Sequence, residues 1–264
     1  MGTNRYWQDL TTREFAGLDA RATIALLPVA AIEQHGPHLP LSTDAVISDA
    51  LVAALIGTAL PRAALLALPA MSIGHSLEHT GFAGSLSIAA ETLLAAWLDI
   101  GRSVARAGLR KLIILNTHGG NTALVQLAAL RLRAELGLVV ARANSFALGE
   151  PAGLFSTDEL KLGIHGGEVE TSLLLHLRPD LVRRDQLANF TGLAHQAARS
   201  NRILGPGRPV GIGWMAEDLH PDGASGDARR ADAGRGQQLF DHMVATLAQL
   251  LEELVDFELP PRGK

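Results

Sequence analysis

Residues 22–45 read ATIALLPVAAIEQHGPHLPLSTDA, and this stretch decides the fold. Its first part is a short apolar run bounded by polar residues, which predicts a buried strand over 22–30. The polar segment 32–45 follows directly and ends where apolar residues begin to recur at helical spacing. A strand, a polar turn and a helix in this order indicate the start of an α/β unit.

The same alternation continues along the chain. Apolar runs at 63–70, 111–116 and 138–143 predict three more buried strands, with segments of helical spacing between them. Strands that alternate with helices predict an α/β fold, in which helices cover the faces of a central, mostly parallel sheet. Further expected elements are a helix from Glu168 to Pro179, an irregular loop region at 205–227 and an amphipathic helix at 230–254.

Length and composition are typical of one well-packed globular domain. The 264 residues are 47% hydrophobic and 19% charged, and no repeat or linker stands out, so we expect a single domain over residues 1–264. The net charge of −4 gives no basic surplus and argues against nucleic acid as a partner. No apolar stretch reaches the roughly 18 residues that span a bilayer. The polar start lacks the apolar core of a secretory signal. We therefore expect a cytoplasmic protein without a membrane role.

The chain contains no cysteine, which narrows its possible chemistry. A disulfide, a thiolate nucleophile and a Cys-based zinc site are excluded. The sequence also lacks the H-E-x-x-H, G-x-S-x-G, P-loop and G-x-G-x-x-G patterns. Any metal would therefore be held by His, Asp and Glu side chains.

The densest group of candidate ligands directly follows the first predicted strand. Glu33 and His35 lie two residues apart, so both side chains can face one ion in extended chain. Asp44 stands where the next helix begins, and one carboxylate can bridge two metals. The alternative is a surface acid, a packed loop histidine and a helix N-cap. The position after a buried strand favours a metal site, because ligands bind at that edge of α/β sheets.

Two later segments carry similar side chains. His118 lies in NTHGGNT (116–122) after another predicted strand, so it either reaches the same crevice or is an ordinary turn histidine. His165 precedes a helix whose first turn carries Glu168 and Glu170. Both acids favour a helix N-terminus, and either one could instead be a metal ligand or proton carrier. Periodicity does not separate these two glutamates.

A fourth polar segment, GHSLEHTGFAGSLS (74–87), contains His75, Glu78 and His79. Its spacing matches no zinc-binding helix. A lid, a wall of the substrate site and a solvated loop are all compatible with this composition.

Together these segments resemble the creatininase (creatinine amidohydrolase) family. The resemblance rests on LPVAAIEQHGPHLPLSTD, EHTGFAGSLSI, NTHGGN and HGGEVETSLLLHLRPDLV, with a weaker likeness in GASGDARRADAGRG. It implies a three-layer α/β sandwich, a homo-oligomer that is often a hexamer, and two divalent ions per chain (Zn, Mn or Fe).

The resemblance also implies roles for individual residues. Glu33, Asp44 and His118 would hold one metal, while His35 and Asp44 would hold the other. Asp44 would thus be the bridging ligand. His165 matches a histidine of the family's later motif and is the candidate general acid or base, with Glu168 as a second candidate for proton transfer.

The chain departs from creatininase itself in three places. Creatininase carries a metal-binding glutamate two residues after the histidine that matches His118, and here that position is Gly120. We expect Glu170 to replace it. Tryptophans that close over the substrate are missing from 140–165, and Ala30 and Ala31 replace a small Gly-Ser pair. Creatinine is therefore doubtful as the substrate.

The expected activity is metal-dependent hydrolysis of a C–N amide bond in a small-molecule amide. The substrate would be a cyclic amide, a formamide or a short, modified cofactor-precursor peptide. A non-catalytic metal-binding protein with the same fold is the alternative, because Gly120 removes a ligand.

Overall fold

The computed structural model describes residues 4–207 and 210–260. Within these ranges five strands form one sheet in the order β1-β3-β2-β4-β5, and every neighbouring pair is parallel. The four strands expected from the sequence are confirmed, whereas the edge strand β1 was not predicted. The strands are β1 (Arg5–Tyr6), β2 (Thr23–Val29), β3 (Ala64–Ala67), β4 (Lys111–Asn116) and β5 (Val139–Asn144).

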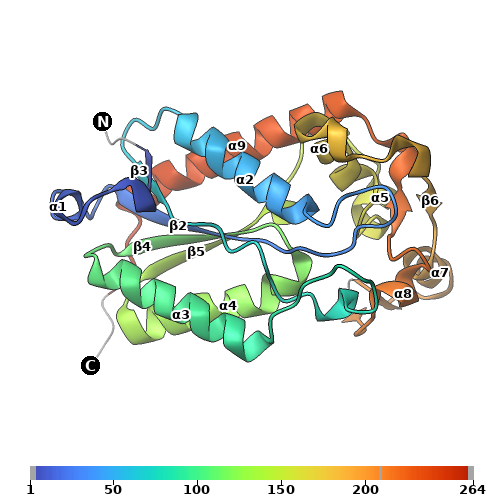
Figure 1. Cartoon of the computed structure of the whole chain (residues 1–264), viewed down its shortest axis with the longest axis horizontal. Helices are drawn as coiled ribbons and strands as arrows, with labels where there is room; N and C mark the ends of the chain where they lie inside the picture. Colours follow the sequence, from blue (N-terminus) through green and yellow to red (C-terminus); the bar gives the residue numbers. More distant parts are fainter. Residues whose placement is uncertain (1–3, 208–209, 261–264) are drawn as a thin grey trace.

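Helices cover both faces of this sheet (Figure 1). Successive side chains of a strand point to opposite faces, so an apolar strand such as β2 supplies two cores. Ile24 and Leu26 pack with one set of helices, and Leu27 and Val29 pack with the other. This confirms the three-layer arrangement. The first set is α2 (Thr43–Gly57), α6 (Glu168–Leu177) and α9 (Ala233–Asp256), and the second is α3 (Ala90–Arg106) and α4 (Thr122–Leu136).

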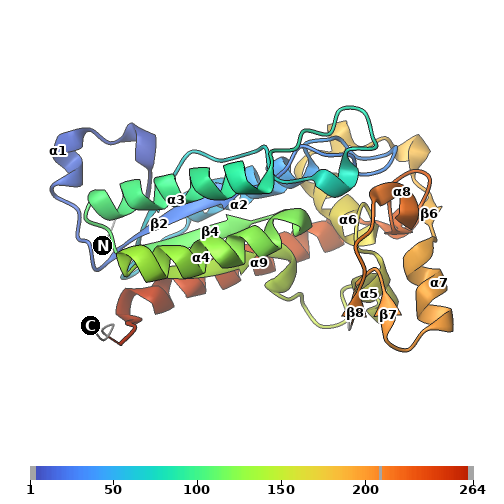
Figure 2. The ribbon, with the colours of Figure 1, turned by 90° about the horizontal axis from the view of Figure 1, so that it is seen from below.

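The remaining short elements gather mainly beyond the carboxyl ends of the strands, on the right in Figure 2. Strand β6 pairs antiparallel with β9, and β7 pairs parallel with β8. The region 205–227, expected to be an irregular loop, therefore contains short regular elements. These elements are α5 (Thr157–Leu162), β6 (Asn189–Phe190), α7 (Leu193–Ser200), β7 (Leu204–Gly205), β8 (Val210–Gly211), α8 (Ala216–Leu219) and β9 (Gly226–Asp227), while α1 (Thr12–Phe15) lies near the N-terminus.

The order of the strands places one crevice at the carboxyl edge of the sheet. From β2 the chain moves to β3 on one side, then crosses to β4 on the other side. Ligands bind in open α/β sheets where the strand order reverses in this way. Val29 and Asn116, which end β2 and β4, are direct partners in the sheet. The polar segments that follow these two strands therefore emerge side by side.

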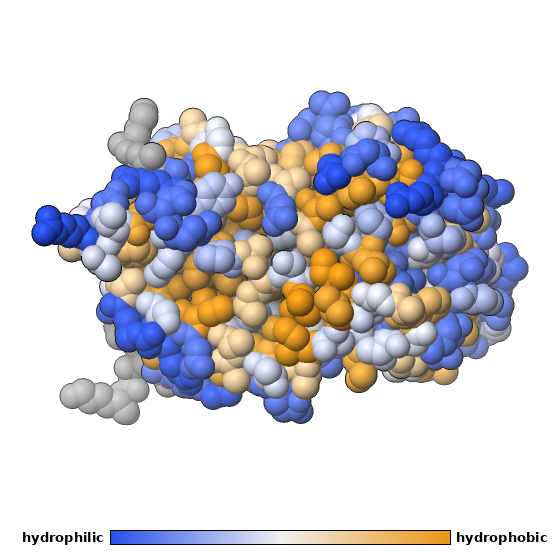
Figure 3. All heavy atoms as spheres, viewed as in Figure 1, coloured by the Kyte–Doolittle hydropathy of each residue, from blue (hydrophilic) through white to orange (hydrophobic). Residues whose placement is uncertain are grey.

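The surface of the molecule carries several large apolar side chains. Figure 3 shows apolar residues across the middle of the face seen in Figure 1. The connection between β3 and α3 lies on this face and exposes Ile73, Leu77 and Leu86. Among the helices of the described residues, none has the length and apolar character needed to cross a membrane.

A close contact between α6 and α9 gives a test of the fold. A Cβ atom at Gly236 would lie 1.9 Å from the Ser172 carbonyl oxygen, so Gly236→Ala must push α9 away from α6. We expect this overpacking to lower the free energy of unfolding by about 1–3 kcal/mol, measured by urea denaturation. Gly234→Ala in the same helix is the control. Gly234 is exposed, and a Cβ atom there would lie 3.2 Å from Oδ1 of the N-cap Asp232. A shift of a few tenths of an ångström relieves this contact, so Gly234→Ala should destabilise the fold much less than Gly236→Ala. Equal effects of the two variants would contradict this packing.

Candidate metal centre

Five candidate ligands from separate parts of the chain meet at the carboxyl edge of the sheet. Glu33 and His35 follow β2, His118 follows β4, Asp44 lies in the first turn of α2, and Glu170 lies in the first turn of α6. The first four are buried, and the Glu170 side chain is 26% exposed. The N-cap of α2 is Ser42 and Asp44 is the second residue of the helix, so the alternative that Asp44 is the N-cap is wrong. Glu33 is 1% exposed, so it is not a surface acid.

Asp44 lies between two histidines and directs one carboxylate oxygen to each. Its Oδ1 is 3.3 Å from Nε2 of His35, and its Oδ2 is 3.3 Å from Nδ1 of His118. Glu33 completes one side, with Oε1 3.1 Å from Nδ1 of His118. On the other side, Oε1 of Glu170 is 3.9 Å from Nε2 of His35. The arrangement has two halves that share Asp44.

The hydrogen bonds of the histidines leave the inward-facing nitrogens available as ligands. Nδ1 of His35 donates to the Glu33 carbonyl oxygen at 3.0 Å, and Nε2 of His118 donates to the His75 carbonyl oxygen at 2.9 Å. Histidines that bind metals commonly donate their other nitrogen in this way.

Unpaired polar atoms also fit a cation at this place. Among the described residues, Glu33 Oε2, His35 Nε2 and Asp44 Oδ2 are buried without a hydrogen-bond partner. Buried polar atoms are rarely left unpaired. An all-nitrogen-and-oxygen donor set of this kind suits Zn²⁺ or Mn²⁺.

The concentration of buried charge shifts the pKa values of the histidines. Burial by itself disfavours the imidazolium form of His35, but Asp44, with help from Glu170 and Glu33, outweighs burial and raises the pKa of His35 to about 10. The same competition between burial and the carboxylates of Glu33 and Asp44 raises the pKa of His118 well above its usual value. Without a metal, protons therefore occupy the nitrogens that would bind it.

His165 lies beside this cluster, as expected. Its ring lies between those of His35 and His79, tilted by 33° and 34°, with centroid distances of 4.2 and 4.4 Å. Nε2 donates to the Gln34 carbonyl oxygen at 2.6 Å, and Nδ1 points towards Glu33 Oε1, 4.0 Å away. Burial, followed by the charge of His35, lowers the pKa of His165, so this ring is neutral.

His79 also lies at the site, although the sequence had left open whether its segment forms a lid, a wall of the substrate site or a solvated loop. It comes from the polar segment 74–87, yet it is 2% exposed and its Nε2 lies 3.3 Å from Oε1 of Glu33. Trp214 stands edge-on to His79, with ring centroids 6.4 Å apart. The segment after β8 thus brings an aromatic side chain next to His79. No periodic pattern in the sequence links these segments.

Glu168, the second candidate for proton transfer, is not brought to the cluster. Its fully buried carboxylate pairs with Arg235 of α9 and lies 3.6 Å from Nε of Arg230. Residues two apart on a helix lie about 200° apart around its axis, so Glu168 and Glu170 face different directions. The structure therefore gives Glu168 an ion pair with Arg235 of α9 instead of a place among the candidate ligands.

The space beside Gly120 is filled by Glu78. A Cβ atom at Gly120 would lie 2.4 Å from both Glu78 Oε1 and His118 Nε2. Burial raises the pKa of Glu78, and its Oε1 is 3.8 Å from Nε2 of His118. The missing side chain at Gly120 thus makes room for an acid from another segment.

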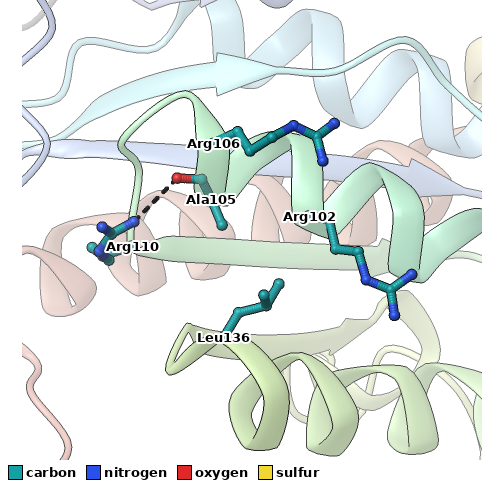
Figure 4. Close-up of a pocket in the computed structure, with 5 residues that line it drawn as sticks. All are labelled: Arg102, Ala105, Arg106, Arg110 and Leu136. Carbon is teal, nitrogen blue, oxygen red and sulfur yellow. Dashed lines mark hydrogen bonds between the residues drawn. The ribbon is translucent and has the colours of Figure 1, made fainter.

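A surface depression elsewhere on the molecule is unrelated to this site. It lies near the C-terminal end of α3 and before β4, at the amino edge of the sheet (Figure 4). Arg110 there donates to the Ala105 carbonyl oxygen at 3.2 Å. Its lining residues are Arg102, Ala105, Arg106, Arg110 and Leu136.

Comparison with known proteins identifies the family of this chain and agrees with its fold. A sequence model of the family described as creatinine amidohydrolase (creatininase) matches residues 8–251. The chain therefore belongs to the creatininase family and is a hydrolase of carbon–nitrogen bonds.

Within that family the chain is similar to enzymes with different names. It is 35% identical over 224 residues to a mycofactocin precursor peptide peptidase of Mycobacterium ulcerans, covering 83% of this chain and 80% of the relative. It is 33% identical over 202 residues to a creatinine amidohydrolase of Pseudomonas putida, covering 69% of this chain and 75% of the relative.

Solved creatininase structures share the fold. A structure described as creatininase with Mn superposes with a TM-score of 0.74 at 23% identity, covering 95% of this chain and 98% of the other. A glutamate-to-glutamine creatininase variant described as Zn–Zn type gives a TM-score of 0.73 at 24% identity, covering 94% and 97%.

Substitution of Gly120 tests the close packing around His118. Gly120→Ala would displace either the Glu78 carboxylate or the His118 ring. Disturbing a group that orients a metal ligand typically weakens metal binding 10- to 100-fold, so we expect Zn²⁺ affinity to fall by roughly this factor. Isothermal titration calorimetry measures the change. Gly119→Ala is the matched control, because a Cβ atom there meets nothing within 4 Å. Unchanged affinity in Gly120→Ala would contradict the described packing.

Metal uptake should release protons from the site. The raised pKa values mean that His35 and His118 carry protons at pH 7 in the metal-free protein. Binding must displace them, so metal affinity should rise with pH, with on the order of one proton released per histidine ligand. Titrations in buffers of different ionisation enthalpy measure this number. A binding heat independent of the buffer would show that the nitrogens are already unprotonated.

Proposed function

We propose that this chain hydrolyses an amide C–N bond with two divalent ions held on either side of Asp44. The observation that carries the proposal is the geometry of Asp44, whose two oxygens each lie 3.3 Å from a different histidine nitrogen. A carboxylate shared in this way suits a two-metal hydrolytic site.

The proposed ligand sets follow the two halves of the cluster. Glu33, Asp44 and His118 would hold one ion, and His35, Asp44 and Glu170 would hold the other. The position of Glu170 supports its role as a metal ligand in place of the glutamate that creatininase has at position 120. Its Oε2 accepts a hydrogen bond from the Gly166 backbone at 2.6 Å, while its Oε1 turns towards His35. Zn²⁺ and Mn²⁺ are the proposed ions, because related creatininase structures are described with these metals.

His165 is the proposed proton carrier of the reaction. Bound divalent ions activate water and polarise an amide carbonyl. The chain itself must move a proton from the attacking water to the departing nitrogen. His165 is neutral because burial lowers its pKa. Its Nε2–H donates to the Gln34 carbonyl oxygen, so Nδ1 carries no hydrogen and faces the cluster. A neutral imidazole held in this way can accept a proton at Nδ1 and pass it on.

For the substrate, we propose a short peptide or peptide-like amide in preference to creatinine. The match to the precursor peptide peptidase covers more of the chain than the match to the creatinine amidohydrolase, 83% against 69%. Two features of the site also argue against creatinine. Position 120 is a glycine, and the aromatic residue beside His79 is Trp214 and not a tryptophan within 140–165. Cyclic amides and formamides are the other substrates to compare.

The location and assembly of the protein stay predictions. A cytoplasmic homo-oligomer is expected from the sequence and from the family resemblance. The exposed apolar side chains Ile73, Leu77 and Leu86 are compatible with contacts between copies of the chain.

Asp44→Ala tests the proposed function. Losing the shared ligand should leave less than one ion bound per chain and lower kcat/KM at least 10³-fold, about 4 kcal/mol of transition-state stabilisation. Activity is measured with Zn²⁺- or Mn²⁺-loaded protein on short peptides, formamides, lactams and creatinine. Asp49→Ala, an exposed acid on the same helix, is the matched control and should keep full activity. Full activity of Asp44→Ala, or a wild-type protein that binds no divalent ion, would refute the proposal.

A further inference from the structure

The side chain of Gln34 is held in a single orientation by its surroundings. Its Oε1 accepts a hydrogen bond from the Gly36 backbone N–H at 2.9 Å, and its Nε2 donates to the Gly223 carbonyl oxygen at 2.8 Å. A flipped amide would set two donors against each other on one side and two acceptors on the other. The amide is 5% exposed, so water does not replace these partners.

The backbone around Gln34 is shaped to admit this amide. Gly223 has φ +73°, and a Cβ atom there would lie 2.5 Å from Oε1 and 2.6 Å from Nε2 of Gln34. Only glycine allows so close an approach with this backbone conformation. The fixed orientation of the amide is therefore a property of the surrounding chain.

The second N–H of the Gln34 amide determines which nitrogen of His79 carries hydrogen. Nε2 of Gln34 lies 2.8 Å from Nδ1 of His79. The other nearby nitrogen, Nε2 of His165 at 3.3 Å, already donates to the Gln34 carbonyl oxygen and cannot accept. Nδ1 of His79 must therefore be an acceptor, and the hydrogen of the neutral ring lies on Nε2.

This tautomer makes His79 a donor to the metal site and not a ligand of it. Nε2–H of His79 points to Oε1 of Glu33, 3.3 Å away, which leaves the unpaired Oε2 of Glu33 for a cation. Ligand atoms of Glu33, His79 and His165 lie within 4.8 Å of one another, close enough to hold an ion by themselves. An ion could bind Nε2 of His79 only if the hydrogen moved to Nδ1, where it would face the donating amide of Gln34.

We propose that Gln34 is the positioning residue that sets both histidine tautomers beside the metal centre. Its side chain fixes His79 as a hydrogen-bond donor to Glu33, and its backbone oxygen fixes His165 with a free Nδ1. Gln34 thereby orients the Glu33 ligand and disfavours the binding of a further cation at His79. This inference deepens the proposed function and rests on the two-metal site described there.

Gln34→Glu tests the proposal by replacing a donor with an acceptor. The carboxylate cannot donate to His79, so the hydrogen should move to Nδ1 and leave Nε2 free. We expect ¹⁵N spectra of histidine-labelled protein to report the Nε2–H form of His79 in the wild type and the Nδ1–H form in the variant. Zn²⁺ titration should show roughly 10- to 100-fold weaker binding at the Glu33 site, together with an additional equivalent of bound Zn²⁺. Gln196→Glu adds the same charge on the exposed face of α7 and should change neither measurement.

Variants of His79 show whether weaker Zn²⁺ binding in Gln34→Glu comes from the lost hydrogen bond or from misfolding of that variant. His79→Phe removes the donor and identifies the His79 signals by their disappearance, and it should weaken Zn²⁺ binding to a similar degree. His79→Gln keeps an N–H donor and should restore most of the affinity. An Nδ1–H tautomer of His79 in the wild type would overturn the inference. So would unchanged Zn²⁺ affinity in both Gln34→Glu and His79→Phe.

The two proposals fail in different ways. A wild-type protein that binds no Zn²⁺ refutes the metal-dependent function. The tautomer of His79 is measurable in the metal-free protein, so it still supports or overturns the role of Gln34.

Discussion

The burial of the Asp44 carboxylate between two imidazoles is the constraint on which the site depends. Removing a charge from water is costly unless partners surround it, and here the partners are His35 and His118. These histidines come from segments that follow β2 and β4, which are adjacent in the sheet. The strand order that reverses at β2 therefore does more than organise the core. It brings opposite charges to one point and makes a dense cluster of buried ionisable groups tolerable.

The helical layer behind the sheet decides which acids reach that cluster. Glu168 is held by Arg235 and Arg230 of the C-terminal part of the chain, and this pairing fixes the rotation of α6 about its axis. With the helix in that orientation, Glu170 faces His35. The close approach of α9 at Gly236 keeps the two helices in contact. A long helix far from the chemistry thus positions a candidate ligand.

Relatives with different names share this fold. In this chain the absence of a side chain at Gly120 gives space to Glu78, and Trp214, from a segment late in the sequence, lies edge-on to His79. Both features lie in connecting segments and not in the strands of the central sheet. Fold resemblance alone therefore does not identify a substrate.

The sequence by itself determined the layered architecture and the central candidate ligands. Short apolar runs alternating with helical spacing predicted four of the strands and the main helices, because a strand buried on both faces must be apolar throughout. Glu33, His35, Asp44 and His118 were found because each lies directly after a strand or at the start of a helix. Tertiary structure alone decided the rest. The rotation of α6 about its axis decides that Glu170 and not Glu168 faces the cluster, and packing against α9 sets this rotation. His79 and Trp214 come from segments without periodicity. The role of Gln34 depends on Gly223, which only folding brings next to its amide.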